Sequence, residues 1–281
     1  MNTTHPTPYP ELNTVLLRLV NDAQNLLGDN FTGAYLQGSF AVGDFDEDSD
    51  VDFLVITEDE VSEADVAALQ AMHGSIYDLE SAWAKHLEGS YIPKDELRNY
   101  DKEALRHFDP ARRQYLYLDN CSRELIRSTH DNTLVVRWVL RQRGITLAGP
   151  EPKTLMDPIS GDDLRQEIRA TMAAWARQLK AAPEQMNNRW YQPFAVLSYC
   201  RMLHTLHTGV IESKPAAAQW AKTALDSSWA DLIQRDWDER PDPFLKVQQK
   251  ADPDDFKSTF EFIEYSLKHA ARPELSHNQC K

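Results

Sequence analysis

The chain has 281 residues, enough for one large domain or two of modest size. Its composition, 42% hydrophobic and 26% charged, is that of a folded globular protein and excludes wholesale disorder. Asp and Glu number 44 against 30 Lys and Arg, so the formal net charge is -14. A field of that sign repels nucleic acid and anionic lipid and attracts cations, so we expect neither a nucleic-acid nor a membrane partner.

The cysteines and the N-terminal segment indicate a cytoplasmic protein. Cys121, Cys200 and Cys280 are far apart and odd in number, which suits neither a disulfide framework nor a zinc site of the CxxC type. Residues 1–11 are polar and lack the basic start and apolar stretch of a secretory signal. No apolar run reaches 18 residues, so we expect no membrane span.

The first half of the sequence alternates helical and extended patterns. Apolar residues recur every three or four positions over 12–27, which predicts an amphipathic helix that ends at Gly28. Short β-branched or mixed segments predict strands at 32–36, 51–56 and 89–92. Further helical patterns lie at 60–72, 78–86 and 134–141. This half is therefore predicted to be a mixed α/β domain with a small sheet.

The second half has helical periodicity almost throughout. Glycines and prolines between Gly144 and Pro158 form the densest group of chain breakers, so we place a domain boundary after residue 150. Helices are predicted at 162–179, 191–207, 216–236 and 254–271, separated by Pro183, Gly209, Pro241 and Pro243. The expected architecture is an α/β domain over 1–150 and an all-α helical bundle over 151–281.

An acidic loop between the first two predicted strands carries the chemistry. Gly38 allows the backbone to approach a ligand closely, and Ser39 adds a hydroxyl and free N–H groups at a helix start, an arrangement that binds phosphate oxygens. Asp50 and Asp52 are two residues apart on a strand, so their carboxylates leave the same face and can share divalent cations. The pattern predicts a phosphate-binding turn beside a Mg2+ site.

Two other interpretations of this loop are weaker. A calcium-binding EF-hand that starts at Asp44 would need Gly and Glu where the chain has Ser49 and Val55. A plain solvated loop is disfavoured because Asp50 and Asp52 adjoin an apolar strand, where carboxylates are costly unless a partner compensates them. A bound metal ion would compensate both carboxylates.

Two separate blocks of sequence resemble one family. Gly38-Ser39, three residues, Gly43, five residues and Ser49-Asp50-Val51-Asp52 resemble the signature of the polymerase-β-type nucleotidyltransferases, including Ala41. A second block is similar to the helical domain of the spectinomycin/streptomycin 3''-adenylyltransferases, through Leu197, Arg201, Thr205-Leu206, Thr208-Gly209, Ile211, Ser213-Lys214, Ala217-Ala218 and Trp220. With an intermediate match at Leu87-Glu88, the resemblance to the aminoglycoside nucleotidyltransferase family covers most of residues 30–225.

The resemblance implies a fold and a reaction. It implies a nucleotidyltransferase domain over 1–150, a helical domain over 151–281, and an enzyme that confers antibiotic resistance. The reaction would be Mg2+-dependent transfer of AMP from ATP to a hydroxyl of an aminoglycoside or aminocyclitol, similar to streptomycin or spectinomycin, with release of pyrophosphate. The partners would then be ATP and a small cationic, hydroxylated substrate. The oligomeric state is open, and a monomer is compatible with the sequence.

The resemblance also implies roles for individual residues. Asp50 and Asp52 would hold Mg2+, and Gly38 and Ser39 would bind the β and γ phosphates. Lys214 would reach the triphosphate from the helical domain. Glu88 matches the family's catalytic Glu and would be the general base. The nearby acids Glu80 and Asp78 compete for that role if the strand is placed differently, whereas His73 and His86 are interpreted as packing or surface residues.

The acceptor site is the least determined part of the prediction. Trp175 aligns with a tryptophan that lines the family's drug site, and Tyr191 is a further candidate for contact with the acceptor. The family's acidic residues before the helix of Leu197 are absent, and Asp131 and Glu184 are possible replacements. Two alternatives therefore stay open: the same catalysis on another small-molecule or protein hydroxyl, and a non-catalytic, antitoxin-like module.

Overall fold

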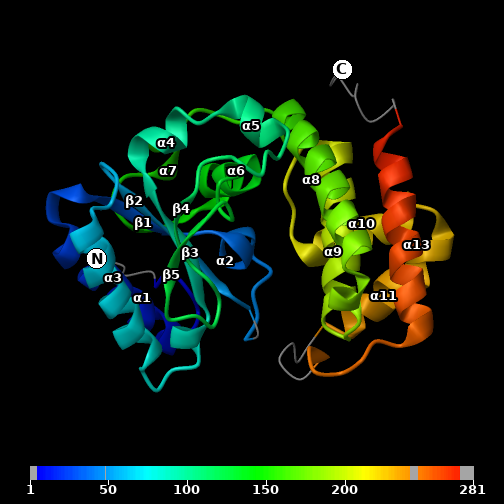
Figure 1. Ribbon diagram of the computed structural model, residues 1–281, viewed down its shortest axis with the longest axis horizontal. Coiled ribbons are helices and arrows are strands. Elements are labelled where there is room, and N and C mark those ends of the chain that lie inside the picture. Colours follow the sequence, from blue (N-terminus) through cyan, green and yellow to red (C-terminus); the bar gives the residue numbers. More distant parts are fainter. Residues whose placement is uncertain (1–4, 48, 241–245, 273–281) are drawn as a thin grey trace. The chain divides into compact units, whose positions relative to one another are not determined.

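A computed structural model describes residues 5–47, 49–240 and 246–272. The chain divides into two compact units, Met1–Leu105 with Asp109–Ile159, and Arg106–Phe108 with Ser160–Lys281 (Figure 1). Cys280 and the predicted helix separators Pro241 and Pro243 lie outside the described residues. The two units are considered one after the other.

The first unit is built on a six-stranded mixed sheet in the order β5-β4-β3-β2-β1-β6. Strands β2 and β3 pair in parallel, and every other neighbouring pair is antiparallel. The strands are β1 (Phe31–Leu36), β2 (Val51–Thr57), β3 (Leu87–Pro93), β4 (Tyr115–Leu118), β5 (Leu125–Ser128) and β6 (Ile145–Ala148). The predicted α/β class with a small mixed sheet is confirmed.

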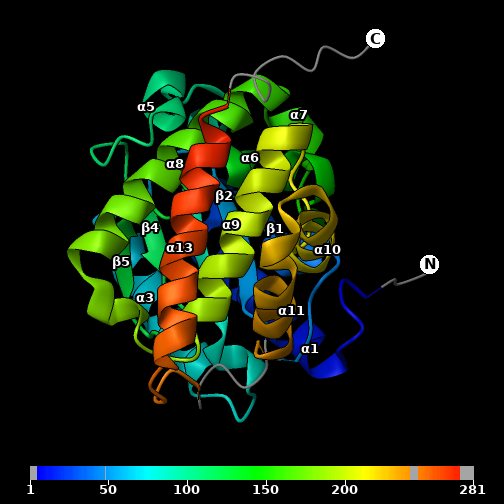
Figure 2. The same cartoon turned by 90° about the vertical axis from the view of Figure 1, so that its right-hand side faces the viewer.

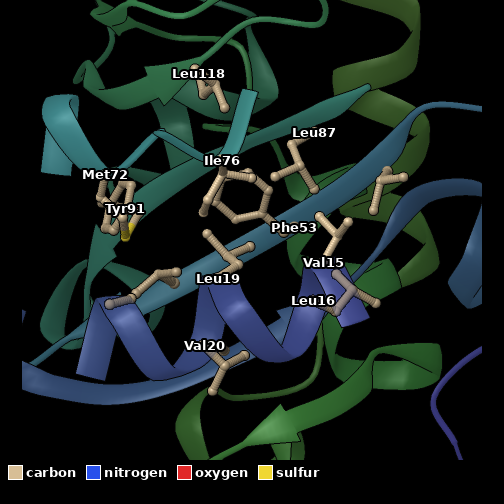
Figure 3. Close-up of a cluster of buried hydrophobic side chains, with 14 of the residues drawn as sticks. Val15, Leu16, Leu19, Val20, Phe53, Met72, Ile76, Leu87, Tyr91 and Leu118 are labelled. Carbon is tan, nitrogen blue, oxygen red and sulfur yellow. The ribbon is translucent and has the colours of Figure 1, made fainter. Parts of the chain in front are cut away.

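Helices cover both faces of this sheet, which explains why β2 is almost entirely apolar. Helices α1 (Pro10–Leu27) and α3 (Glu63–Tyr77) pack on the sheet face that carries Phe53. Val15, Leu16 and Leu19 of α1 belong to the same buried cluster as Phe53 (Figure 3). The opposite face carries Leu54, which packs with residues of α6 (Leu134–Arg143) and α7 (Pro152–Leu155). Period-2 alternation places Asp52 on the same face as Leu54.

Short elements connect these layers. Helix α2 (Gly38–Val42) follows β1, and α4 (Lys94–Arg98) and α5 (Lys102–Arg106) follow β3. Single 3-10 turns occur at Gly28–Asn30 and Trp83–Lys85. Helical turns are predicted at 78–86, and within that segment the structure contains only the 3-10 turn at Trp83–Lys85.

The second unit consists of helices arranged around α9 (Tyr191–Thr208), which packs against α8, α10, α11 and α13 (Figure 2). These helices are α8 (Gly161–Ala181), α10 (Lys214–Ala224), α11 (Ala230–Asp238) and α13 (Pro253–Ala270). Tyr199 and Cys200 of α9 are fully buried at the centre of this arrangement. The predicted all-α bundle is confirmed, and no described helix is long and apolar enough to cross a membrane.

The prediction of one continuous helix over 216–236 is wrong, because α10 ends at Ala224 and a 3-10 turn at Ser227–Trp229 precedes α11. The Asp226 carboxylate accepts from the Ser228 backbone N–H at 3.0 Å and caps that turn, which competes with helix continuation. The breaker-rich stretch that begins at Gly144 contains β6, which pairs with β1, so the chain stays in the first unit as far as Ile159.

Neighbouring leucines of α1 test the packing of the first unit. We expect Leu16→Ala, at a fully buried position, to lower the free energy of unfolding of this unit by about 2 to 5 kcal/mol through the cavity it leaves. Leu17 is 61% exposed, so Leu17→Ala should change that free energy by less than about 0.5 kcal/mol. Hydrogen exchange of the β2 amides measures both. Equal effects would contradict the assignment of the buried face.

Candidate active site

The parallel pairing of β2 with β3 brings two candidate acids together. Asp52 and Glu88 are register partners in this pair, so their Cα atoms lie on neighbouring strands and their side chains leave the same face of the sheet. Asp50 immediately precedes β2, Asp52 is the second residue of that strand, and all three acids are partly buried. The structure thus gathers the three predicted carboxylates at the start of two adjacent strands.

The turn after β1 lies against the Asp52 carboxylate. The Gln37 backbone N–H donates to the Asp52 carbonyl at 2.9 Å, and Gly38 follows with a φ of 55° at the start of α2. A Cβ atom at Gly38 would stand 1.8 Å from Asp52 Oδ2. The Ser39 hydroxyl is buried and has no hydrogen-bond partner within the described part of the chain. Glycine is therefore required at this turn, and Ser39 offers an unused hydrogen-bonding group beside the carboxylates.

Glu88 sits in a polar but largely buried environment. The Tyr117 hydroxyl donates to Glu88 Oε1 at 2.5 Å, and His130 Nε2 lies 3.2 Å from the same oxygen. The Tyr117 and His130 rings stack with centroids 4.9 Å apart. Burial raises the pKa of Glu88 to about 7; the Tyr117 hydrogen bond lowers it, while the charges of nearby acids, Asp50 foremost, raise it. A carboxyl group with a pKa near neutrality is suited to accept a proton.

Asp50 is held by a neighbour from a later loop. The Asn120 side-chain amide donates to Asp50 Oδ1, and Asn120 Oδ1 lies 3.2 Å from His86 Nδ1. His73, by contrast, is buried in the core, where its Nε2 lies 2.8 Å from the Tyr91 hydroxyl. Burial lowers the pKa of His73 to about 3, so the ring is neutral and acts in packing.

Asp131 links the turn to the strand that carries Glu88. Its side chain is 3% exposed; Ser90 Oγ donates to Oδ2 at 2.7 Å and Gln37 Nε2 to Oδ1 at 3.4 Å. Burial raises the pKa of Asp131, while His130 and these two hydrogen bonds lower it. Buried with both oxygens occupied, Asp131 is a poor candidate for contact with an acceptor, whereas Glu184 is exposed in the 3-10 turn Pro183–Met186.

The remaining sequence candidates belong to the helical unit. Lys214 is the first residue of α10, after the N-cap Ser213, and is partly buried. Trp175 Nε1 donates to the Tyr191 hydroxyl at 3.3 Å, and the Trp175 ring stacks on Tyr199 at 5.2 Å. Both predicted acceptor residues are part of one aromatic cluster formed by Trp175, Trp190, Tyr191, Phe194 and Tyr199.

Three residues that surround the carboxylates carry no recognisable site signal in the sequence. Tyr117, Asn120 and His130 come from β4 and from the loops that flank β4 and β5, far from the motif in sequence. No spacing rule connects these positions to the acidic loop. The local signal is the Tyr-Leu-Tyr-Leu run of β4, whose aromatic residues favour a strand, while its place beside β3 is visible only in the structure.

Asp50 and Asp52 fit a magnesium ion that is bound together with a ligand. The described residues contain no group of three or more His, Cys, Asp or Glu side chains arranged around a metal. Mg2+ commonly takes one or two carboxylates and completes its coordination with substrate phosphates and water. A pair of carboxylates beside the Ser39 hydroxyl matches that donor set better than a closed metal site.

Comparisons with known proteins agree with this fold and define a nucleotidyltransferase. A family model described as a nucleotidyltransferase domain matches residues 21–108, and one described as the C-terminal domain of aminoglycoside adenylyltransferase matches residues 154–264. The two matches cover the carboxylate motif and most of the helical unit. The chain is accordingly a nucleotidyltransferase, and its second half is similar to the C-terminal domain of the aminoglycoside adenylyltransferases.

Individual relatives are similar over most of their length. The spectinomycin 9-adenylyltransferase of Campylobacter jejuni is 25% identical over 226 residues, which are 77% of this chain and 80% of the relative. The aminoglycoside (3'') (9) adenylyltransferase of Escherichia coli is 24% identical over 231 residues, 79% of this chain and 82% of the relative. The crystal structure of spectinomycin adenyltransferase AAD(9) from Enterococcus faecialis with ATP and spectinomycin has the same fold, with a TM-score of 0.65 and 14% identity. It covers 92% of this chain and 99% of that chain.

Two glycines give opposite predictions for the same substitution. Gly38→Ala forces a Cβ against the Asp52 carboxylate at a positive φ, so we expect a loss of stability of about 1 to 3 kcal/mol. Gly74 lies inside α3 with open space around a Cβ, and Gly74→Ala should stabilise by roughly 0.5 to 1 kcal/mol. Scanning calorimetry measures both, and a neutral Gly38→Ala would show that the turn relaxes freely.

The raised pKa of Glu88 predicts a pH-dependent stability. The folded protein favours the protonated form of the Glu88 carboxyl. The contribution of Glu88 to the free energy of unfolding is therefore complete below the ordinary pKa of 4.5 and is lost as pH rises through about 7. Without divalent metal, Glu88→Gln should therefore match the wild-type protein near pH ~4 and exceed its unfolding free energy by about 1 to 3 kcal/mol near pH ~8. Exposed Glu80→Gln serves as the control. Urea unfolding across this pH range would contradict the assignment if the two variants behaved alike.

Proposed function

We propose that this protein transfers AMP from Mg2+-ATP to a hydroxyl of an aminoglycoside or aminocyclitol, with spectinomycin and streptomycin as the first candidates, and releases pyrophosphate. The observation that carries the proposal is the grouping of Asp50, Asp52 and Glu88 on one sheet face beside the Gly38-Ser39 turn. The names of the relatives, which act on spectinomycin or aminoglycosides, support the acceptor class.

The triphosphate would be held by groups that offer hydrogen-bond donors. The Ser39 hydroxyl lacks a partner among the described residues, and the backbone N–H groups of the turn adjoin it. Lys214 supplies a cation from the first position of α10. Placed donors of this kind are needed because the net charge of -14 otherwise repels a polyphosphate.

Asp50 and Asp52 would hold the divalent cation. When bound, Mg2+ would neutralise charge on the phosphates and help to stabilise the attacking and leaving oxygens. The Asn120 amide fixes one oxygen of Asp50, and the Gly38 turn packs against Asp52. Both carboxylates are thereby oriented by the protein itself before any ligand binds.

Glu88 would act as the general base. The acceptor oxygen forms a bond to the α-phosphorus, the bond from that phosphorus to the oxygen bridging to the β-phosphorus breaks, and pyrophosphate leaves with that bonding pair. Glu88 takes the proton of the acceptor hydroxyl. Tyr117 and His130 fix the position of Glu88 Oε1, and burial keeps the pKa of Glu88 near neutrality.

The helical unit would contribute the acceptor contacts. An aminoglycoside carries ammonium groups, which aromatic faces and an acidic field attract. The aromatic cluster around Trp175 and Tyr191 offers such faces, and Phe194 of this cluster is 38% exposed. These contacts support a cationic acceptor but do not select one drug.

Pyrophosphate release tests the proposal. Purified protein with Mg2+-ATP is assayed against a panel of aminoglycosides and aminocyclitols that includes streptomycin and spectinomycin. We expect release with at least one drug, and a loss of about 100-fold or more in kcat for Asp50→Asn and for Glu88→Gln. Glu80→Gln should retain the wild-type rate, since Glu80 is exposed outside the strand that carries Glu88.

Other outcomes discriminate the alternatives. If Mg2+-ATP binds but no drug of the panel triggers release, the acceptor assignment fails and another hydroxyl substrate must be sought. If Mg2+-ATP does not bind, the catalytic proposal itself fails in favour of a non-catalytic module.

A further inference from the structure

The helical unit contains a cavity of about 480 Å³. It lies among the start of α9, the end of α11 and the segment that leads into α13, and all of its lining residues belong to the Ser160–Lys281 unit. Its volume is within the roughly 300 to 1,000 Å³ typical of sites for small molecules, and is far larger than one water molecule needs.

Two buried polar groups in the wall of this cavity have no hydrogen-bond partner. Gln192 and Asp236 are each 4% exposed and both line the cavity. Within the part of the chain that the structure describes, neither Gln192 Nε2 nor Asp236 Oδ2 makes a hydrogen bond. Leaving a buried donor or acceptor unsatisfied costs about 1 to 3 kcal/mol, so a ligand that pairs with both groups would be stabilised at this cavity.

The other acids of the wall already have partners. Glu239 pairs with Arg189 and with Lys246, and Asp255 pairs with Arg235 at 2.7 Å. Asp252 caps α13 by accepting from the Asp254 backbone N–H at 2.8 Å. Asp236 differs from these three acids, because its buried Oδ2 has no hydrogen-bond partner among the described residues.

The charge and polarity of the two open groups define the ligand. Burial raises the pKa of Asp236 to about 7; Arg235 lowers it, while Asp255 and Glu239 raise it. A cation would relieve the cost of this buried carboxylate, whereas an anion would increase it. Gln192 Nε2 is a donor, so the same ligand must also present an acceptor oxygen.

We propose that this cavity binds a small organic ammonium ion that also carries hydroxyl groups. The ammonium group donates to Asp236 Oδ2, and a ligand hydroxyl oxygen accepts from Gln192 Nε2. The proposal goes beyond the AMP transfer described above, because it involves neither Asp50, Asp52 and Glu88 nor any other residue of the first unit.

Matched ligands test the two halves of this recognition. In calorimetric titrations of the full chain at mildly alkaline pH, we expect 2-deoxystreptamine, which has ammonium and hydroxyl groups on one ring, to bind. Cyclohexylamine lacks the hydroxyls and myo-inositol lacks the ammonium, so each should bind at least about tenfold more weakly. Equal binding of all three ligands, or no binding of 2-deoxystreptamine, would overturn the proposal.

Matched variants locate the binding. We expect Asp236→Asn to weaken 2-deoxystreptamine at least tenfold and Gln192→Leu to weaken it severalfold, while Asp231→Asn, at an exposed position of the same helix, leaves it unchanged. Nitrogen-15 spectra of the wild-type protein provide a readout without mutation, because the Gln192 side-chain amide should shift on titration. An unmoved amide together with wild-type affinity in Asp236→Asn would refute the assignment.

The active-site variant separates this inference from the proposed function. Asp50→Asn should abolish AMP transfer and still bind 2-deoxystreptamine with wild-type affinity. Binding that is lost in Asp50→Asn and kept in Asp236→Asn would place the ammonium at the first unit's carboxylates and overturn the inference. A protein that transfers no AMP but loses 2-deoxystreptamine binding in Asp236→Asn would sink the proposed function alone.

Discussion

The parallel pairing of β2 with β3 is the constraint on which the first unit's site depends. Parallel strands in register keep neighbouring side chains on one face at a fixed separation, and here the partners are Asp52 and Glu88. Burial makes Glu88 costly to charge, and the negative charges of nearby acids, Asp50 foremost, add to that cost. The strands stay together because their apolar residues are covered by helices on both faces. The core thereby offsets an arrangement of charges that is unfavourable until a cation or a proton arrives.

The parts of this site that are local in the chain can be predicted from the sequence. Gly38, Ser39, Asp50 and Asp52 belong to one strand, turn and strand unit, so spacing and residue type are enough to group them. Glu88 was placed only through a family resemblance, and its proximity to Asp52 depends on strand pairing across more than thirty residues. Short-range pattern cannot specify such a register, because it is determined by packing of the whole sheet.

The misses have the same physical origin. Strands β4, β5 and β6 have four residues each, too few to show a periodicity of their own, and they form by hydrogen bonding to the neighbouring strand of the sheet. In the helical unit, the Asp226 cap breaks a segment whose apolar spacing reads as one helix. The Asp226 side chain competes for backbone N–H groups and ends the helix there, whereas periodicity alone predicts one continuous helix.

Asp131 connects the Gly38 turn to the strand that carries Glu88. Its two oxygens accept from Gln37, which precedes the Gly38 turn, and from Ser90, which follows Glu88 on β3. Movement of either segment away from the other would leave a buried carboxylate oxygen without a donor, at substantial cost. The turn and the strand therefore behave as one stiff body. When charge shifts between them, their polar groups need little reorientation.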